Sequence, residues 1–184
     1  IIRNHESEGV DFWWIDWQQH LTSNDTYGLS ETFWCNHIFF NDMVRKRTDR
    51  RPVIFHRWGG LGSHRYQIGF SGDALINFQT LGFQPYFTAT ASNVGYGYWG
   101  HDLGGHAFTD ESIVNDPELV LRWIQFGVFT PIFRTHATND ARIERRIWKF
   151  DNFPTMLEAV RLRYSLFPYL YTMAPVSYTH LTLP

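Results

Sequence analysis

The sequence predicts an α/β fold, in which the chain forms about half of a (β/α)8 TIM-type barrel of parallel strands alternating with helices. Short apolar, strand-like runs alternate along the chain with helical segments, which is the pattern of a parallel sheet. Each of these runs also ends in charged or hydrogen-bonding residues, as strands do at the functional face of a barrel. A doubly wound sheet is the alternative, but no G-x-G-x-x-G follows a strand, so a dinucleotide site is not indicated.

Four short apolar runs are predicted as strands. A strand that is buried on both faces reads as a nearly continuous apolar run rather than as an alternating one. The runs are "VDFWWIDW" (10–17), "VIFHR" (53–57), "YGYWGHD" (96–102) and "TPIFRTH" (130–136). Their polar ends are Asp16, Arg57, His101 with Asp102, and Arg134 with His136.

Helices are expected at 30–46, 74–92, 116–129 and 155–173, the second interrupted near Pro85. Ser30 is the expected N-cap of the first helix, and Asp116 followed by proline begins the third. Thr155 and Glu158 form a T-x-x-E capping box for the last helix. The glycine-bearing segment 58–73 is too long for a passive connection, so we expect it to be functional.

The composition is that of a globular domain. Of 184 residues, 43% are hydrophobic and 18% charged, and the net charge of −2 gives no support for nucleic-acid binding. No apolar run reaches the roughly 18 residues of a membrane span. Cys35 is the only cysteine, which excludes an intrachain disulfide and a cysteine-based zinc site. Aromatic residues make up 18%, and their flat apolar faces suit both a core and the binding of sugars.

The ends of the chain suggest that it is part of a longer protein. It does not begin with methionine, so a signal peptide cannot be read and the compartment stays unknown. We expect residues 1–174 to form the partial barrel. The last ten residues, "PVSYTHLTLP" (175–184), differ from the rest in their content of aromatic and charged residues, and we expect them to be foreign sequence.

Two aspartates are the main candidates for chemistry. Asp16 lies among tryptophans at a strand end, and Asp73 follows the glycine-rich "GFSG" just before a helix. Glycoside hydrolysis requires such a pair, one carboxyl protonated and one charged. An apolar surround raises a carboxyl pKa, whereas a nearby arginine keeps a carboxylate charged, and Arg57 and Arg134 are candidates for that arginine. Either aspartate could instead cap a helix or form a structural ion pair.

Four motifs in order resemble those of glycoside hydrolase family 31, which contains α-glucosidases, α-xylosidases and their relatives. "WIDWQQ" (14–19) stands at the nucleophile motif, and "FSGD" (70–73) follows Arg57 at the family's spacing to the acid/base. "GHDLGGH" (100–106) and "FRTH" (133–136) match two further motifs. The resemblance implies that the chain covers roughly strands four to seven of a (β/α)8 barrel.

The resemblance also implies roles for single residues. Asp16 would be the nucleophile, and Asp73 the general acid and then base, of a retaining mechanism without metal or cofactor. The implied substrate-binding residues are Trp14, Trp17, Arg57, Phe70, Asp102, His106 and His136. The implied partners are an oligosaccharide or glycoside substrate and the remainder of the same catalytic domain, without which we expect the chain to be inactive.

The implied activity is that of an exo-acting α-glucosidase on terminal α-linked glucose, with α-xylosidase as the alternative specificity. Departures from the family pattern bear on the sugar more than on the reaction: Trp17 and Gln18 replace methionine and asparagine, Phe70 replaces tryptophan, and His106 replaces phenylalanine. A hypothesis from another class is a non-catalytic carbohydrate-binding module, which would need a β-sandwich. His101, Asp102 and His106 could also form a metal set, although hydrogen bonding or loop structure is the expected role.

Overall fold

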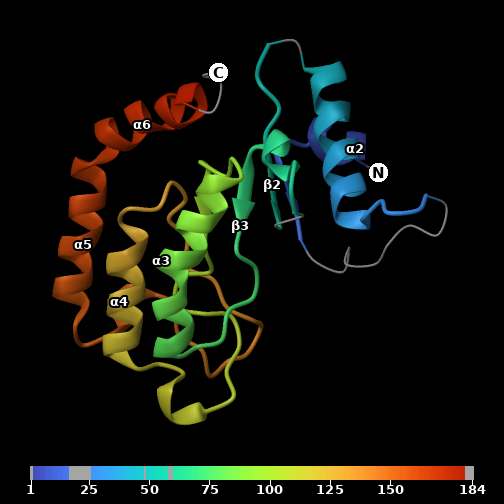
Figure 1. The fold of residues 1–184 in the computed structure, drawn as a ribbon. Coiled ribbons are helices and arrows are strands. Elements are labelled where there is room, and N and C mark those ends of the chain that lie inside the picture. Colours follow the sequence, from blue (N-terminus) through green and yellow to red (C-terminus); the bar gives the residue numbers. More distant parts are fainter. Residues whose placement is uncertain (1, 17–25, 48, 58–59, 181–184) are drawn as a thin grey trace. The chain divides into compact units, whose positions relative to one another are not determined.

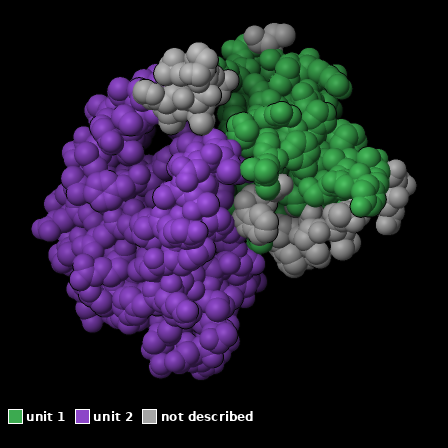
Figure 2. Space-filling view, viewed as in Figure 1, with its two compact units in different colours: residues 1–70 green, residues 71–184 purple. Residues whose placement is uncertain are grey.

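The computed structural model describes residues 2–16, 26–47, 49–57 and 60–180. The chain divides into two compact units, unit 1 (Ile1–Phe70) and unit 2 (Ser71–Pro184), which Figure 2 shows in green and purple. Parallel strands and helices occur together, so the α/β class is confirmed (Figure 1). None of the described helices is long and apolar enough to cross a membrane.

Unit 1 contains three parallel strands: β1 (Trp13–Ile15), β2 (Ile54–Arg57) and β3 (Ile68–Phe70). The first two confirm the predicted strands. β3 lies inside the segment expected to be an irregular loop, because three residues are too few to show a period. The register pairs Ile15 with His56 and Arg57 with Phe70, so the carboxyl ends of all three strands meet at one edge.

Helix α2 (Glu31–Lys46) packs on this sheet, and α1 (Ile2–Ser7) and the 3-10 helix η1 (Ser63–Tyr66) complete the unit. The predicted cap is confirmed, since the Phe33 N–H donates to Ser30 Oγ at 3.1 Å. Met43 of α2 is buried against Ile15 and Ile54. The apolar face of the helix thus holds the strands that carry the polar ends.

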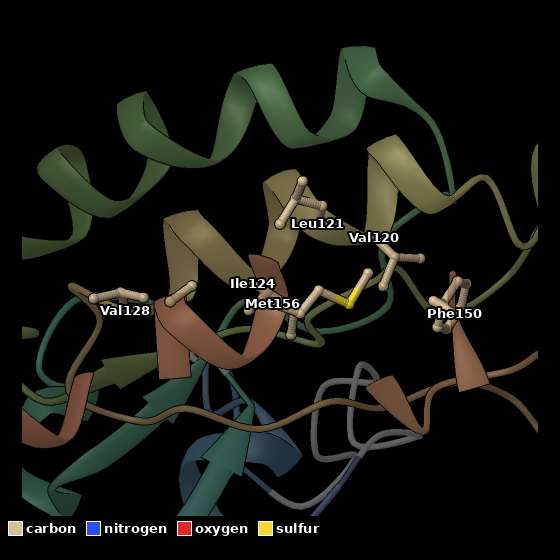
Figure 3. Close-up of a cluster of buried hydrophobic side chains, with 7 residues drawn as sticks. Val120, Leu121, Ile124, Val128, Phe150 and Met156 are labelled. Atoms are coloured by element: carbon tan, nitrogen blue, oxygen red, sulfur yellow. The ribbon is translucent and has the colours of Figure 1, made fainter. Parts of the chain in front are cut away.

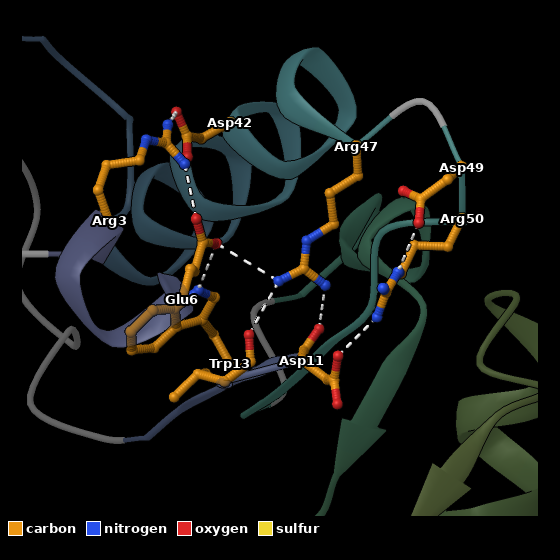
Figure 4. A network of polar contacts seen from close by, with 9 residues as sticks. Arg3, Glu6, Asp11, Trp13, Asp42, Arg47, Asp49 and Arg50 are labelled. Atoms are coloured by element: carbon orange, nitrogen blue, oxygen red, sulfur yellow. Dashed lines mark hydrogen bonds and ion pairs between the residues drawn. The ribbon is translucent and has the colours of Figure 1, made fainter. Parts of the chain in front are cut away.

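A polar network fixes the entry into β1 (Figure 4). Arg47, which follows α2, donates to the backbone carbonyls of Val10, at 3.1 Å, and of Asp11. Glu6 accepts hydrogen bonds from Trp13 Nε1 at 3.2 Å and from Arg3 at 2.7 Å. These contacts tie the start of the strand to the end of α2 and so fix the direction in which β1 runs toward Asp16.

Unit 2 contains β4 (Trp99–Gly100), α3 (Phe78–Asn93), η2 (Glu111–Ile113), α4 (Pro117–Gly127), η3 (Ile147–Lys149), α5 (Phe153–Ser165) and α6 (Phe167–His180). The predicted strand at 130–136 is wrong as a full strand. It forms only an isolated parallel bridge between Leu103 and Thr135. Pro131, at the start of this segment, has no N–H to give to a longer ladder.

The helix boundaries differ from the predictions at two places. α3 begins at Phe78, where Asn77 Oδ1 accepts from the Thr80 N–H at 2.7 Å, and it continues through Pro85 without interruption. The last helix begins earlier than its expected capping box, with Asn152 as N-cap and Pro154 in the first turn. It is also divided at Leu166 into α5 and α6.

Two of the apolar clusters of unit 2 pack around α4. In the first, Val120, Leu121, Ile124 and Val128 at the α4 side pack against Phe150, Met156 and Ala159 (Figure 3). In the second, Trp123 from another face of α4 packs with Leu103 and Leu119, and all three are fully buried. Leu103 directly follows Asp102, so this core anchors the loop after β4.

A buried arginine joins α5 to the end of α4. Arg163 is 8% exposed and donates to the backbone carbonyls of Val128, at 2.9 Å, of Pro131, at 2.7 Å, and of Thr130. A helix leaves its last carbonyls without intrahelical partners, and here a side chain supplies the donors. The same contacts position the start of the segment that leads to Arg134 and His136.

Candidate active site

In unit 1, an ion pair lies where the parallel strands end. Arg57, the last residue of β2, donates from Nε to Asp16 Oδ1 at 2.8 Å. Asp16 directly follows β1, and about a third of its side chain is exposed. The guanidinium of Arg57 also lies 5.8 Å from the ring centroid of Phe70, which ends β3. The pair is therefore held by the register of three strands and still reaches solvent.

Aromatic rings surround this ion pair. Phe55 and Phe70 pack with ring centroids 4.8 Å apart, and Trp14 lies 6.1 Å from Phe70. Trp14 is 43% exposed, so part of its side chain reaches solvent. An exposed aromatic face beside a carboxylate is suited to the apolar face of a sugar ring. Trp17, also predicted to bind substrate, lies outside the described residues.

In unit 2, Asp73 follows Gly72, whose φ of 83° is favourable for glycine. Nearly half of the Asp73 side chain is exposed. Its backbone neighbour, the Ala74 carbonyl, accepts hydrogen bonds from the N–H groups of His106, at 2.7 Å, and Ala107, at 3.2 Å. A parallel bridge between Leu75 and Ala107 continues this contact. The segment that carries Asp73 is thus fastened to the loop after β4.

Asp102 lies two residues after the end of β4 and is 1% exposed. Arg134 donates to its Oδ1, and the Leu103 N–H donates to the Arg134 carbonyl at 3.1 Å. Burial raises the pKa of Asp102 to about 6, although the positive charges of Arg134 and His106 act in the opposite direction. Of the two arginines that the sequence offered, Arg57 contacts Asp16 and Arg134 contacts Asp102.

Two histidines lie beside Asp102. His106 Nδ1 is 3.8 Å from Asp102 Oδ2 and 3.7 Å from Asp73 Oδ1, and its ring centroid is 5.4 Å from that of His136. One ligand atom each of Asp102, His106 and His136 lies within 4.8 Å of the others. His136 reaches this place because its N–H pairs with the Leu103 carbonyl at 3.4 Å.

His101 is not placed as a metal ligand, which was one hypothesis from the sequence. Its side chain is fully buried, with Nδ1 at 2.9 Å from Ser71 Oγ and Nε2 at 2.9 Å from Thr88 Oγ1. Burial lowers its pKa to about 3, so the ring is neutral. The Thr88 hydroxyl joins His101 to α3, and the Ser71 hydroxyl joins it to the segment that leads to Asp73. The histidine beside Asp102 and His106 is His136 instead.

Arg145 supports the site and is not among the residues that the sequence motifs identified. Its Nη2 donates to the carbonyls of Gly104, at 2.8 Å, and Gly105, at 3.2 Å. Both glycines have positive φ, and a Cβ at Gly104 would lie 2.4 Å from Arg145 Nε. The Arg145 side chain thus stabilises the glycine turn that directly precedes His106. Only the G-G pair after Asp102 hinted at such close packing.

Each unit therefore presents an accessible carboxyl group on a rigid frame. In unit 1 a carboxylate is paired with an arginine among aromatic rings. In unit 2 a carboxyl group lies beside histidine and a buried aspartate. Such groups can attack an electrophilic carbon, transfer a proton, or accept hydrogen bonds from hydroxyls.

Comparison with known proteins agrees with this geometry. The family model described as "Glycosyl hydrolases family 31 TIM-barrel domain" matches residues 2–173. This chain belongs to glycosyl hydrolase family 31. The fold is accordingly that of a partial TIM barrel, and the resemblance seen in the sequence motifs is confirmed.

Relatives of this family 31 chain include named glycosidases. It is 33% identical over 159 residues to the "Probable glucan 1,3-alpha-glucosidase" of Oryza sativa subsp. japonica, covering 84% of this chain and 16% of that protein. It is 33% identical to the alpha-xylosidase of Saccharolobus solfataricus, covering 73% and 18%. The structure of the GH31 alpha-xylosidase of Xanthomonas citri superimposes with a TM-score of 0.78 at 27% identity, covering 97% and 22%. The chain thus spans less than a quarter of the length of each.

Proposed function

We propose that this chain is part of a retaining, exo-acting α-glycosidase, an α-glucosidase that hydrolyses terminal α-linked glucose. The observation that carries the proposal is the Asp16–Arg57 pair at the strand ends of a family 31 chain. Residues 1–174 belong to its catalytic barrel. The parallel strands and the helices among the described residues do not fit the β-sandwich that a carbohydrate-binding module would need.

The proposed reaction has two steps. The Asp16 carboxylate attacks the anomeric carbon while the bond to the leaving oxygen breaks and Asp73 gives that oxygen its proton. Asp73, now charged, then takes a proton from water, which attacks the same carbon and releases Asp16. Arg57 orients the nucleophile through their ion pair, and its position beside Phe70, which packs with Trp14, supports this role. Neither step uses a metal or a cofactor.

The remaining polar residues are proposed to bind the sugar. Asp102 and His136 are held by the bridge between residues 103 and 135, so they offer an oxygen and a nitrogen on a fixed frame. His106 lies between Asp73 and Asp102 and is expected to influence which sugar is accepted. Trp14, Phe70 and Trp17 supply the apolar walls.

Substitution of each aspartate in the full-length protein tests the roles separately. On an aryl α-glucoside, Asp16→Ala should lose on the order of 10⁴-fold or more in kcat. Asp73→Ala should lose about 10²–10⁴-fold. The control Asp11→Asn changes an exposed acid of unit 1 and should leave turnover unchanged. Wild-type-like turnover by Asp16→Ala would reject the assignment.

Azide distinguishes the two roles by stereochemistry. In Asp16→Ala, azide takes the place of the missing nucleophile and should give the β-glycosyl azide. In Asp73→Ala, azide attacks the covalent intermediate from the other face and should give the α-glycosyl azide. The same anomer from both variants would contradict the assignment of nucleophile and acid.

An α-xylosidase is the second candidate, because two of the relatives described above carry that name. Side-by-side kcat/KM values on aryl α-glucoside and aryl α-xyloside decide between them. The glucosidase proposal requires the glucoside to be the better substrate, and a preference for the xyloside would replace it.

We also propose that the 184-residue chain is inactive and poorly soluble alone, because it needs the remainder of its barrel. The aromatic side chains of Phe167, Tyr169 and Tyr171 on α6 are more than half exposed, as is Tyr164 on α5. Such a surface is unusual for a free domain and is expected to be covered by other parts of the same protein. A soluble monomer of the isolated chain with clean cooperative unfolding would contradict this proposal.

A further inference from the structure

Asp102, His106 and His136 bring three metal-ligating groups together in unit 2. One carboxylate oxygen and one ring nitrogen from each histidine lie within 4.8 Å of one another. Asp102 is buried, and the two imidazoles are partly exposed, so an ion from solvent can reach the cluster.

Two atoms of this cluster are buried without a hydrogen-bond partner in the described part of the chain. They are Asp102 Oδ2 and His106 Nδ1, which lie 3.8 Å apart. A buried polar atom without a partner is costly, by about 1–3 kcal/mol. The separation is too long for a hydrogen bond. It is close to the roughly 3.3 Å between ligands that share a tetrahedral zinc ion, at metal–ligand distances of about 2.0–2.1 Å.

The backbone holds the three groups in place. Asp102 and His136 flank the bridge between Leu103 and Thr135, and the Thr138 N–H donates to the His106 carbonyl at 2.9 Å. Arg134 occupies only Oδ1 of Asp102 and so leaves Oδ2 directed toward His106. The three ligand atoms thus start within 4.8 Å of one another.

The ligand set selects the kind of ion. Two imidazoles and one carboxylate suit Zn²⁺ and its analogue Co²⁺, whereas Ca²⁺ and Mg²⁺ prefer sets made of oxygen. Asp73, 3.7 Å from His106 Nδ1, adds negative charge that offsets the charge of Arg134. Three protein ligands leave a fourth position for water, as in open zinc sites.

We propose that Asp102, His106 and His136 bind one divalent ion of the zinc type, and that the bound ion excludes the sugar. The second part rests on the proposed function, in which these residues contact the substrate. The first part does not depend on it. The ion is therefore a reversible inhibitor, and the proposed hydrolysis runs without it.

Co²⁺ added to the full-length protein tests binding directly. We expect strong visible absorption bands of low-coordinate Co²⁺, saturating at one ion per chain and lost when Zn²⁺ is added. His106→Phe should weaken Co²⁺ binding by at least about 100-fold, because loss of a ligand costs more than loss of a supporting contact. His106→Gln is the second variant, and the control His5→Gln changes an exposed histidine of unit 1.

Binding that is equal in His106→Phe, His106→Gln and wild type overturns the site, as does a Co²⁺ spectrum that stays that of the hydrated ion. Circular dichroism of each variant establishes that it is folded. In a separate assay, Zn²⁺ should raise KM for the glycoside without changing kcat, and EDTA should restore the original KM. An unchanged KM with a bound ion overturns the exclusion of sugar alone, and absence of any glycosidase activity overturns the proposed function while the Co²⁺ result stands.

Discussion

Replacing Arg163 by methionine removes the donors that its guanidinium gives to three backbone carbonyls at the end of α4. Methionine keeps much of the apolar stem, so the change isolates the polar contacts. A buried acceptor left without a donor costs about 1–3 kcal/mol. The variant also avoids the cost of burying a charge, and water can reach some of the carbonyls. The net loss expected for the three, at Val128, Thr130 and Pro131, is about 3 kcal/mol.

Hydrogen exchange measured by mass spectrometry on the full-length protein shows in which helices this loss of stability occurs. Peptides from α4 and α5 should exchange faster in Arg163→Met, and melting should fall by about 6–12 °C if a cooperative unit of 150–250 residues unfolds. The matched control is Arg161→Met, an exposed position on the same helix, which should change stability by less than about 0.5 kcal/mol. Equal exchange in the two variants would refute the reasoning.

Two further predictions concern other parts of the fold. Gly105 has φ of 83°, and a Cβ there would lie 2.9 Å from the Ile76 backbone, so Gly105→Ala should destabilise unit 2 by about 2–4 kcal/mol, measured by thermal unfolding. His56 is fully buried and burial lowers its pKa from 6.5 to about 4, so the unfolded chain binds a proton below pH 6.5 that the folded chain refuses. The contribution of His56 to stability is therefore complete above about pH 6.5 and should fall by up to about 3 kcal/mol toward pH 4. In urea titrations the loss over this range should be smaller in His56→Gln than in wild type, with the part due to the buried His101 remaining.

Each of these two predictions has its own control variant. Gly82→Ala adds a methyl group in open space on α3 and should stabilise the protein by about 0.5–1 kcal/mol. Destabilisation equal to that of Gly105→Ala would show that strain at Gly105 is not the cause. For the pH dependence, His5→Gln should retain the full slope, and the burial argument fails if His56→Gln retains it too.

Features with a local signal could be predicted from the sequence. Ser30 and Asp116 cap their helices as expected, because a cap depends on a few neighbouring residues. The Thr155 capping box failed because Asn152 and Pro154 begin the helix one turn earlier.

In the candidate site, too, residues with a local sequence signal could be predicted and residues without one could not. Asp16, Arg57 and Asp102 could be identified because each ends a strand-like run, and the structure places Arg57 against Asp16. The place of His136 beside Asp102 could not be identified, because it depends on a bridge between segments about thirty residues apart. The sequence offered His101, which lies next to Asp102 in the chain, as the second histidine of a metal set.

The two hydrogen bonds accepted by the Ala74 carbonyl limit which sequence changes this site can tolerate. Both N–H groups come from residues 106 and 107, so an inserted residue in either loop would break the bridge and displace Asp73 together with His106. Changes at this site are then expected to arise by exchange of side chains at constant loop length. A mutant library that varies the identity of residue 106 should retain folded members far more often than one that lengthens the segment around it.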